Sequence, residues 1–537
     1  MAIAFAVFDY GIGERWLNWI VYGVAVIYVS INVAVVRVLF SPLTLSMLRA
    51  AGGPLADSIR YYLTFQNITA MAATVAAGAV LPVVIRALMP PLQGIFVKYS
   101  IAFVVIFLAA GPYAISKVDT GGRYRNAFGA LWPIHLHQFS GPAATQQWRT
   151  SPFPISSERQ IDLVRYRGAA AGRNVVLILL ESTAARYWPE TTGTDPMPNL
   201  TALSAQGIVF LNAYAVYPES IKGLLSILCS RYPAFNVPPE AYPSMHCAAL
   251  PQELANAGYR TALFHSGRFM YLGMPDVIQN RGFEVLEDAG AIGGNIHSSF
   301  GVDDMSTVHR LLSWIDSLKP GERFFVTYLP VAGHHPYVSP EAGPFGATGE
   351  DIPIVHYLDA VHYGDRAFGV LLDGLRTRGL EDKTLFLVFG DHGEAFGEHE
   401  GNFGHTQFIY DENVHVPYVI AAPGLIQESI RSHNAISLID TAPSILDLLG
   451  IPIPEDLQGT SVLEPGSRMS LFFTDYSLGW LGLQDACRKY LFEMDSARSH
   501  LFDVCTDPRE SADISSREPG RTSAYRSIAE HWIGSVR

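Results

Sequence analysis

A dense group of titratable residues follows a buried-strand pattern in the second half of the chain. The apolar run Leu385–Phe389 ends at Gly390. Seven side chains that could bind a metal or move a proton come within the next fifteen positions: Asp391, His392, Glu394, Glu398, His399, Glu400 and His405. Open α/β sheets present ligands at the carboxyl ends of their strands. The pattern therefore predicts a metal site here, completed by residues from other segments.

Two upstream segments could complete such a site. The apolar run Asn174–Leu180 is followed by Glu181, and a carboxylate just past a buried strand is well placed as a hard oxygen ligand. The alternative is an acid at a helix amino terminus, stabilised by the helix dipole. Ser220 precedes an apolar helical pattern. It is either an ordinary N-cap or a metal-activated nucleophile beside a helix amino terminus that holds an anion.

Strand and helix patterns alternate from residue 174 onward. Apolar runs predict strands, and amphipathic stretches between them predict helices. The predicted strands are Asn174–Leu180, Ile208–Ala213, Arg260–Phe264, Phe324–Leu329, Thr384–Phe389 and Val416–Ala421, and the predicted helices include Leu250–Ala257, Met305–Leu318, Tyr357–Arg376 and Ser437–Leu449. A final hairpin at Tyr490–Phe502 precedes a small tail. This order predicts an α/β sandwich with a mainly parallel sheet.

The amino-terminal part is strongly apolar. Three uncharged runs, 17–36, 61–85 and 99–116, are each long enough to cross a bilayer core of about 30 Å. We therefore expect a membrane domain at 1–118, a juxtamembrane linker at 119–172 and a catalytic domain at 173–537. Basic residues in the loops do not decide the orientation. The expectation is a multi-pass protein of the plasma or inner membrane with an extracytoplasmic catalytic domain.

Charge and cysteine content narrow the functional classes. The net charge of −13 disfavours a general nucleic-acid binder, which needs a basic face against phosphates. Cys229 and Cys247 lie eighteen positions apart, and so do Cys487 and Cys505. Two local disulfides in an exported domain would explain this spacing. Four buried thiols are the alternative.

The order of these segments resembles the sulfatase branch of the alkaline phosphatase superfamily. The resemblance covers residues 173–515. It is carried, in order, by NVVLILLES, Ser220 with the S-R-Y-P that follows its helix, GYRTALFHSG, GHHPY, FGDHGEAFGEH, HVPYVIAAPG, ISLIDTAPSILDLLGI and a carboxyl-terminal hairpin at Lys489–Glu510. With membrane spans in front, the architecture is similar to lipoteichoic acid synthases and phosphoethanolamine transferases. Those enzymes transfer a phosphorylated lipid headgroup through a covalent enzyme intermediate.

The resemblance assigns roles to individual residues. It makes four residues the ligands of one divalent metal: Glu181, Ser220, Asp391 and His392. Ser220 is then also the nucleophile, His334 contacts the ester or serves the leaving group, and His405 replaces a lysine that many sulfatases have. His265, Arg268 and Lys222 are expected to bind the substrate. By the same resemblance, Glu394, Glu398, His399 and Glu400 are expected to be scaffold or surface residues.

The ligand chemistry favours particular metals. Two carboxylates and one imidazole fit Zn²⁺ or Mn²⁺ better than Ca²⁺, which prefers oxygen alone, and Mg²⁺ stays open. Such a cation lowers the pKa of a bound hydroxyl and neutralises charge on the transferring group. Histidines suit proton transfer near neutral pH, which fits the roles of His334 and His405.

The nucleophile segment departs from the sulfatase pattern. Sulfatases that convert this residue to formylglycine carry the pattern C/S-x-P-x-R. This chain has Ser220-Ile221-Lys222-Gly223-Leu224 there, without the proline and the arginine. An unmodified serine favours phosphoryl-headgroup transfer or phosphodiester cleavage on a phosphorylated lipid or envelope glycan at the bilayer. A sulfatase acting on sulfated glycans or aryl sulfates is the first alternative. A non-catalytic membrane sensor is the second.

Overall fold

A computed structural model describes residues 5, 15–39, 43, 63–88, 148–154, 161–188, 193–235, 237, 241–242, 245–270, 273–294, 296–298, 301–346, 352–466, 468–476, 479–494 and 496–536. Two compact units divide the chain, one built mainly from residues 1–134 and the other from most of 135–537. Each unit is described by itself.

Two long apolar helices make up most of the described part of the first unit. Helix α2 spans Arg15–Leu39 and helix α5 spans Phe65–Leu88. The two helices lie side by side. The Tyr22 hydroxyl of α2 donates to Gly78 O of α5 at 2.9 Å, and the Ser30 hydroxyl donates to Met71 O at 3.0 Å. Both are long and apolar enough to cross a membrane by length and composition. The predicted span 99–116 lies outside the described residues, so three spans and their orientation stay predictions.

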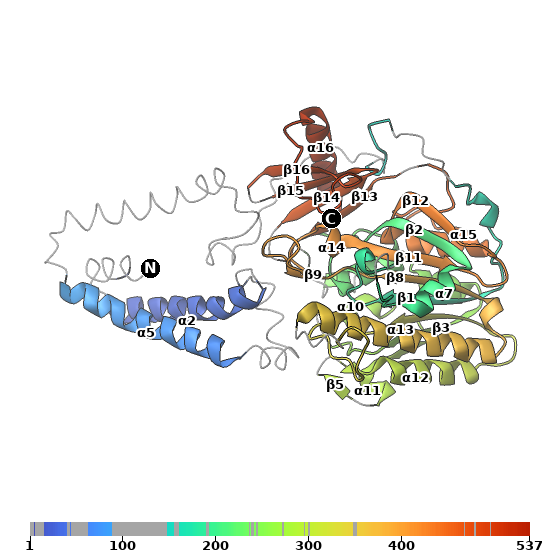
Figure 1. Cartoon of the computed structure of the whole chain (residues 1–537), viewed down its shortest axis with the longest axis horizontal. Helices are drawn as coiled ribbons and strands as arrows, with labels where there is room; N and C mark the ends of the chain where they lie inside the picture. The colour runs from blue at the N-terminus through green and yellow to red at the C-terminus, as the bar shows by residue number, and fades with distance from the viewer. Residues whose placement is uncertain are drawn as a thin grey trace. The chain divides into compact units, whose positions relative to one another are not determined.

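An eight-stranded sheet organises the second unit (Figure 1), in the order β12-β2-β11-β8-β1-β7-β3-β4. Its strands are β1 Asn174–Leu180, β2 Gly207–Tyr214, β3 Tyr259–His265, β4 Val285–Glu287, β7 Arg323–Leu329, β8 Thr384–Gly390, β11 His415–Ala421 and β12 Ile430–Ser437. All neighbours run parallel except β11, which is antiparallel to both β2 and β8. The predicted mainly parallel sheet is confirmed, and each predicted strand is present within a residue or two of its predicted ends.

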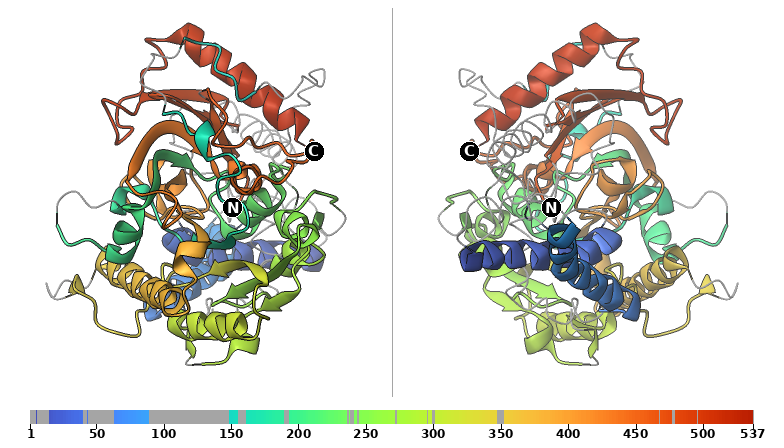
Figure 2. Two further views of the ribbon diagram at one scale, coloured as in Figure 1. Left: turned by 90° about the vertical axis from the view of Figure 1, so that its right-hand side faces the viewer. Right: turned by 90° about the vertical axis from the view of Figure 1, so that its left-hand side faces the viewer.

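Helices cover the sheet because its central strands are apolar on both faces. All seven residues of β8 are buried, as are the first six of β1, which is the pattern of a sheet packed on both sides. Helices α7 Pro198–Ser204, α12 Asp304–Asp316 and α13 Pro353–Thr377 share one hydrophobic core with β1 and β7. Figure 2 shows α12 and α13, in yellow-green and yellow, at the opposite end of the unit from the red α16.

Shorter elements connect these layers. The remaining helices are α8 Ser220–Cys229, α9 Leu250–Asn256, α10 Met274–Ile278, α11 Ala289–Ile292, α14 Asp411–Val414, α15 Thr441–Leu449 and α16 Pro519–Ser535. Two small two-stranded sheets are formed by β5 Ile296–Ser298 with β6 Gly301–Val302 and by β9 Ala395–Phe396 with β10 Phe403–Gly404.

The carboxyl-terminal part forms a second, four-stranded sheet. Its strands are β13 Ser470–Thr474, β14 Trp480–Asp485, β15 Arg488–Glu493 and β16 Arg498–Asp503. The predicted final hairpin corresponds to β15 and β16. Disulfides join Cys229 to Cys247 and Cys487 to Cys505, so the paired-cysteine interpretation is confirmed and the free-thiol alternative is wrong.

The predicted linker ends earlier than residue 172. The guanidinium of Arg149 is buried and donates to both oxygens of Asp440, at 2.5 and 2.7 Å, and to Met469 O at 3.0 Å. Arg167 pairs with Asp447 at 2.8 Å. Residues 148–154 and 161–172 therefore belong to the catalytic unit. Local sequence patterns do not indicate these contacts, because the acidic partners lie 291 and 280 positions away.

Candidate active site

The register between β1 and β8 builds the base of the site. Leu180 pairs with Gly390, so Glu181 and Asp391 leave adjacent parallel strands side by side. The amide of Asp391 donates to Leu180 O at 3.1 Å. In return, Asp391 Oδ1 accepts from the amides of Ser182 and His392, at 3.0 and 2.8 Å. The Asp391 carboxylate is thereby fixed by the ends of both strands.

Ser220 joins this pair from a different part of the chain. Its hydroxyl lies 3.0 Å from Glu181 Oε2 and 3.2 Å from His392 Nε2. His392 is fully buried, and its Nδ1 lies 3.0 Å from Gly393 O. That contact fixes Nδ1 as the donor and leaves Nε2 facing Ser220 and the carboxylates. The structure thus brings together all four predicted metal ligands.

Glu219, rather than Ser220, is the N-cap of α8. Its carboxylate accepts from the amides of Ile221 and Lys222, at 3.0 and 3.2 Å. The N-cap interpretation of Ser220 is therefore wrong. The amides of Ile221 and Lys222 are occupied by Glu219, and the anion expected at this helix end stays a prediction. The cap leaves the Ser220 hydroxyl available for the ligand cluster.

The four residues fit a divalent cation. Ligand atoms of Glu181, Asp391 and His392 all lie within 4.8 Å of one another, and all three residues are buried. Within the described ranges, neither carboxylate forms an ion pair with a lysine or arginine. Burial and the charge of Asp391 raise the pKa of Glu181 to about 7. Two buried like charges without a basic partner call for a cation, and the mixed oxygen and nitrogen donors suit zinc or manganese.

His405 faces this cluster from the loop after β8. Its ring centroid lies 4.2 Å from that of His392, and its Nδ1 lies 2.7 Å from Glu394 Oε2. Glu394 is 1% exposed, and its second oxygen accepts a hydrogen bond from the Tyr337 hydroxyl. Burial acts to raise the pKa of Glu394, but the charge and hydrogen bond of His405 hold it below its usual range. Glu394 is thus a buried partner of His405, which fits the scaffold alternative of the prediction and not the surface one.

His334 lies in the loop after β7. Its Nδ1 is 2.6 Å from His335 O, and burial lowers the pKa of its imidazole. The preceding residues Val331 and Ala332 are held by their amides on the buried Asp304 carboxylate, at 2.9 and 3.1 Å. His334 and His335 line a cavity of about 40 Å³ together with Asp303, Asp304 and Tyr363. His334 therefore borders a small open space at the loop after β7.

The chain also matches a known protein family. The sulfatase family model matches residues 173–451, more than half of the chain. The chain belongs to the sulfatase family. Bovine arylsulfatase K is 25% identical over 445 residues, which cover 65% of this chain and 80% of that protein. This sulfatase-family member is accordingly an enzyme of the alkaline phosphatase superfamily, as its sequence resemblance implied.

Solved structures place the enzyme in the same fold. A lipoteichoic acid synthase from Listeria monocytogenes has a TM-score of 0.54 at 19% identity, over 69% of this chain and 94% of that one. An alkaline phosphatase superfamily protein from Vibrio parahaemolyticus also has a TM-score of 0.54, at 17% identity, over 73% of this chain and 99% of that one. At these identities the likeness concerns the fold alone.

The predicted substrate-binding residues of this sulfatase-family enzyme differ in their surroundings. Lys222 is buried and its Nζ lies 2.7 Å from Asp475 Oδ1, so its charge is already paired. Burial lowers the pKa of His265 to about 4, and its Nδ1 lies 3.1 Å from Leu329 O. His265 is therefore neutral at pH 7 and cannot supply the expected positive charge. Arg268 is half-buried in the loop after β3, and its role stays a prediction.

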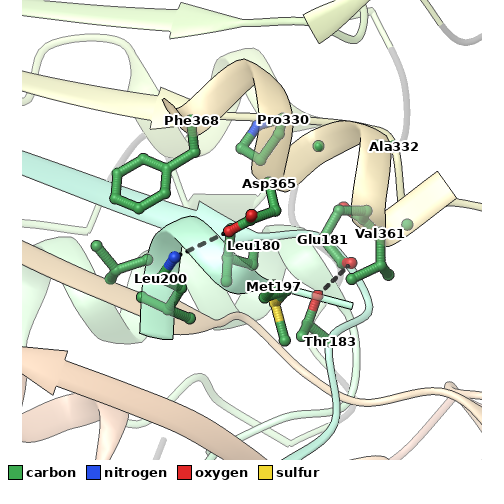
Figure 3. Close-up of a pocket in the computed structure, with 13 residues that line it drawn as sticks. Leu180, Glu181, Thr183, Met197, Leu200, Pro330, Ala332, Val361, Asp365 and Phe368 are labelled. Atoms are coloured by element: carbon green, nitrogen blue, oxygen red, sulfur yellow. Dashed lines mark hydrogen bonds between the residues drawn. The ribbon is translucent and has the colours of Figure 1, made fainter. Parts of the chain in front are cut away.

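A second cavity lies behind Glu181 (Figure 3). It measures about 20 Å³, and the figure shows Leu180, Met197, Val361 and Phe368 around it. Asp365, also at this cavity, accepts hydrogen bonds from the start of α7, including the Leu200 amide at 3.0 Å. A space of this size holds one water molecule at most. It therefore cannot admit a substrate.

The roles of two site residues escaped the sequence analysis. Glu219 was overlooked because an acid one residue before a helix is common and carries no signal of its own. Glu394 is among the titratable residues that the sequence groups here, but the resemblance ranks it with Glu398 and Glu400 as scaffold or surface. Its spacing of eleven residues from His405 gives no periodic sign of a contact. Only the pairing of β9 with β10, at Ala395 and Gly404, brings the two together.

Proposed function

We propose that this enzyme is a metal-dependent ester hydrolase or transferase with Ser220 as its nucleophile. The observation that carries the proposal is the position of the Ser220 hydroxyl between Glu181 Oε2 and His392 Nε2. A divalent cation held by Glu181, Ser220, Asp391 and His392 would lower the pKa of that hydroxyl and neutralise charge on the transferring group.

The reaction balances with the residues around the cluster. Ser220 Oγ forms a bond to the sulfur or phosphorus of the ester, and Glu181 Oε2 is placed to take the hydroxyl proton. The bond to the leaving oxygen breaks, and that oxygen takes a proton from Nε2 of His405 in its imidazolium form, whose Nδ1 donates to Glu394, while His334 contacts the ester. Water or an acceptor hydroxyl then releases the group from Ser220.

A sulfuric ester is the better supported substrate class. The family model and the relative named arylsulfatase K both support cleavage of sulfate esters, on sulfated glycans or aryl sulfates. They support this reading more than the phosphoryl transfer expected from the sequence. A negatively charged ester also fits a site whose carboxylates are balanced by a cation.

Phosphoryl transfer or phosphodiester cleavage is the second candidate. The stretch Ser220–Leu224 lacks the proline and arginine of the formylglycine pattern, which favours an unmodified serine. Lys222 is paired with Asp475 instead of extending towards an incoming sulfate. The fold is also shared with a lipoteichoic acid synthase. These observations concern the nucleophile itself, so they justify testing both ester types.

A membrane anchor belongs to the same proposal. Helices α2 and α5 meet the length and composition of membrane spans, and the two disulfides suit an oxidising compartment outside the cytoplasm. We propose that the catalytic unit acts there on a glycan or lipid-linked ester at the membrane surface.

One experiment tests these proposals together. The full chain in detergent, with Zn²⁺ or Mn²⁺, is offered a nitrophenyl sulfate, a nitrophenyl phosphodiester and a fluorescent phospholipid. Ser220→Ala should abolish turnover, whereas Ser226→Ala, a change in the same helix, should not. Turnover of sulfate alone excludes the phosphoryl candidate, and turnover of phosphoesters alone excludes the sulfate candidate.

Two further results decide the chemistry at Ser220. The mass of the peptide carrying this residue distinguishes serine from formylglycine, because the modification removes two hydrogens. Absence of both turnover and bound metal would overturn the proposed function and favour the sensor alternative.

A further inference from the structure

Glu394 is a buried acid that has no direct role in the proposed reaction. Its side chain is 1% exposed and comes from the loop directly after the ligand His392. Burying a carboxylate is costly unless it is paired and hydrogen-bonded. Both of its oxygens are engaged, one by His405 and one by Tyr337.

We propose that Glu394 is a positioning residue that orients His405 towards the leaving group of the ester. This inference rests on the proposed function, because it concerns how His405 serves that reaction. Glu394 itself does not touch the reacting atoms. It acts through His405, as the carboxylate partner of a catalytic histidine does in other hydrolases.

The contact with His405 fixes both the tautomer and the angle of the ring. Nδ1 lies 2.7 Å from Glu394 Oε2, so Nδ1 carries a hydrogen and donates it. The ring is tilted by 32° against that of His392 at a centroid distance of 4.2 Å. In the described part of the chain, Nε2 has no hydrogen-bond partner. It is therefore the atom left to meet the substrate on the metal side.

Tyr337 holds the other end of Glu394. Its hydroxyl donates to Oε1, and its ring packs against Tyr357 and Phe396, each at a centroid distance of 5.6 Å. Tyr337 closes the segment His334–Tyr337, which carries the other predicted substrate histidine. The chain Tyr337–Glu394–His405 thus connects the loops after β7 and β8 at the site where the leaving group departs.

The loop that carries His405 is also fixed from behind. The Asn413 side-chain amide donates to Gly404 O at 3.2 Å. Gly404 pairs with Ala395, the residue after Glu394. Backbone contacts therefore set the distance between Glu394 and His405, and the carboxylate then decides which way the ring faces.

The choice of leaving group separates positioning from mere support of the fold. A nitrophenolate departs readily without a proton, whereas an alkoxide needs one in the transition state. If Glu394 orients His405, its loss should slow cleavage of an alkyl ester much more than cleavage of the matching nitrophenyl ester. A residue that only supports the loop should affect both esters equally.

The test uses the full chain with metal and a pair of esters that share the transferred group, sulfate or phosphate. We expect Glu394→Gln to lower kcat/KM for the methyl ester at least tenfold more than for the nitrophenyl ester. His405→Gln should give the same pattern, and the double variant should be no worse than His405→Gln alone. Tyr337→Phe should shift the ratio in the same direction by less.

Glu412→Gln is the matched control. Glu412 is a buried glutamate that also pairs with a histidine of this loop, His399, at 2.7 Å. Its variant should leave the ratio between the two esters unchanged. Bound metal, measured by elemental analysis after dialysis, should be the same in Glu394→Gln and the wild type, because Glu394 is not a ligand.

The outcomes are distinct. An equal loss on both esters, additive effects in the double variant, or loss of metal in Glu394→Gln would each overturn the positioning role while Ser220-dependent turnover persists. If the wild type cleaves neither ester, or if Ser220→Ala is as active, the proposed function fails and this inference fails with it.

Discussion

The carboxylate of Glu219 caps helix α8 and leaves the hydroxyl of Ser220, the first residue of that helix, out of the capping. A serine at the start of a helix usually satisfies a free backbone amide. Here the neighbouring acid takes the amides of Ile221 and Lys222. The Ser220 hydroxyl, the proposed nucleophile, is therefore left to donate to Glu181.

Replacing this cap should impair both stability and turnover. We expect Glu219→Ala to destabilise the catalytic unit by about 0.5–2 kcal/mol. It should also lower kcat, because a helix that starts one residue later would use the Ser220 hydroxyl as its cap. Glu219→Asn, which can still accept from the same amides, should stay close to the wild type. Thermal unfolding and ester turnover measure the two effects, and an unchanged melting temperature in Glu219→Ala would refute the capping role.

The buried pair Glu181 and Asp391 predicts that the effect of Glu181→Gln on stability changes sign when metal is added. In chelator, Glu181→Gln should be more stable than the wild type, because it removes one of two like charges in a buried site. With Zn²⁺ or Mn²⁺, the wild type should gain about 2.7 kcal/mol at one hundred times the dissociation constant. The variant should gain less, because it lacks a ligand.

Thermal unfolding with and without metal measures this reversal. Glu341→Gln is the control, since its carboxylate is half-exposed and pairs with Arg366 away from the cluster. An equal gain from metal in Glu181→Gln and the wild type would show that Glu181 is not a ligand.

Much of the fold could be predicted because periodicity is a local signal. The central strands are apolar on both faces, and the burial of all seven residues of β8 follows from that composition. The proposed metal ligands could be found for the same reason, since each stands at or next to one end of a strand or helix. That these residues meet at one site was predicted from the family resemblance. The pairing of Leu180 with Gly390, which brings two of them together, cannot be seen in either segment alone.

Contacts between distant segments could not be predicted. The pairing of Lys222 with Asp475 joins residues 253 positions apart, and nothing near Lys222 indicates that its charge is already used. His265 looked like a source of positive charge because it follows a strand beside Arg268. Its neutrality depends on burial, which a single sequence does not report.

The neutral state of His265 predicts a pH dependence of stability. Its pKa is about 4 in the folded enzyme, against 6.5 for an exposed imidazole, and burial is the main cause. The folded state therefore binds this proton less well than the unfolded state. Above pH 6.5, His265 does not lower the free energy of unfolding. As the pH drops from 6.5 to 4, the free energy of unfolding falls by about 3 kcal/mol because of this residue.

His265→Gln should lack this component, because glutamine does not titrate. Melting temperatures measured between pH 4 and 8 should fall less steeply on the acid side for the variant than for the wild type. Parallel curves would show that the pKa of His265 is not lowered in the folded enzyme, so that His265 could carry a positive charge for substrate binding below pH 6.5.

The buried pair Arg149 and Asp440 predicts where the catalytic unit starts. Their side chains are 7% and 4% exposed and meet through two hydrogen bonds. Removing one partner of such a pair leaves an uncompensated buried charge, so Arg149→Ala should cost about 3–5 kcal/mol. Arg376→Ala is the control: that arginine is 59% exposed, and its loss should cost about 0.5 kcal/mol or less.

The same pair distinguishes two possible start points of the catalytic unit, Trp148 and residue 173. A fragment beginning at Trp148 should retain the melting temperature of the unit in the full chain. A fragment beginning at residue 173 should melt much lower, because it loses Arg149 and leaves Asp440 unpaired in the core. Equal stability of the two fragments would mean that the segment before β1 is a linker after all. Asp440 would then have to be satisfied by its remaining donors, the amides of Ser437 and Thr460.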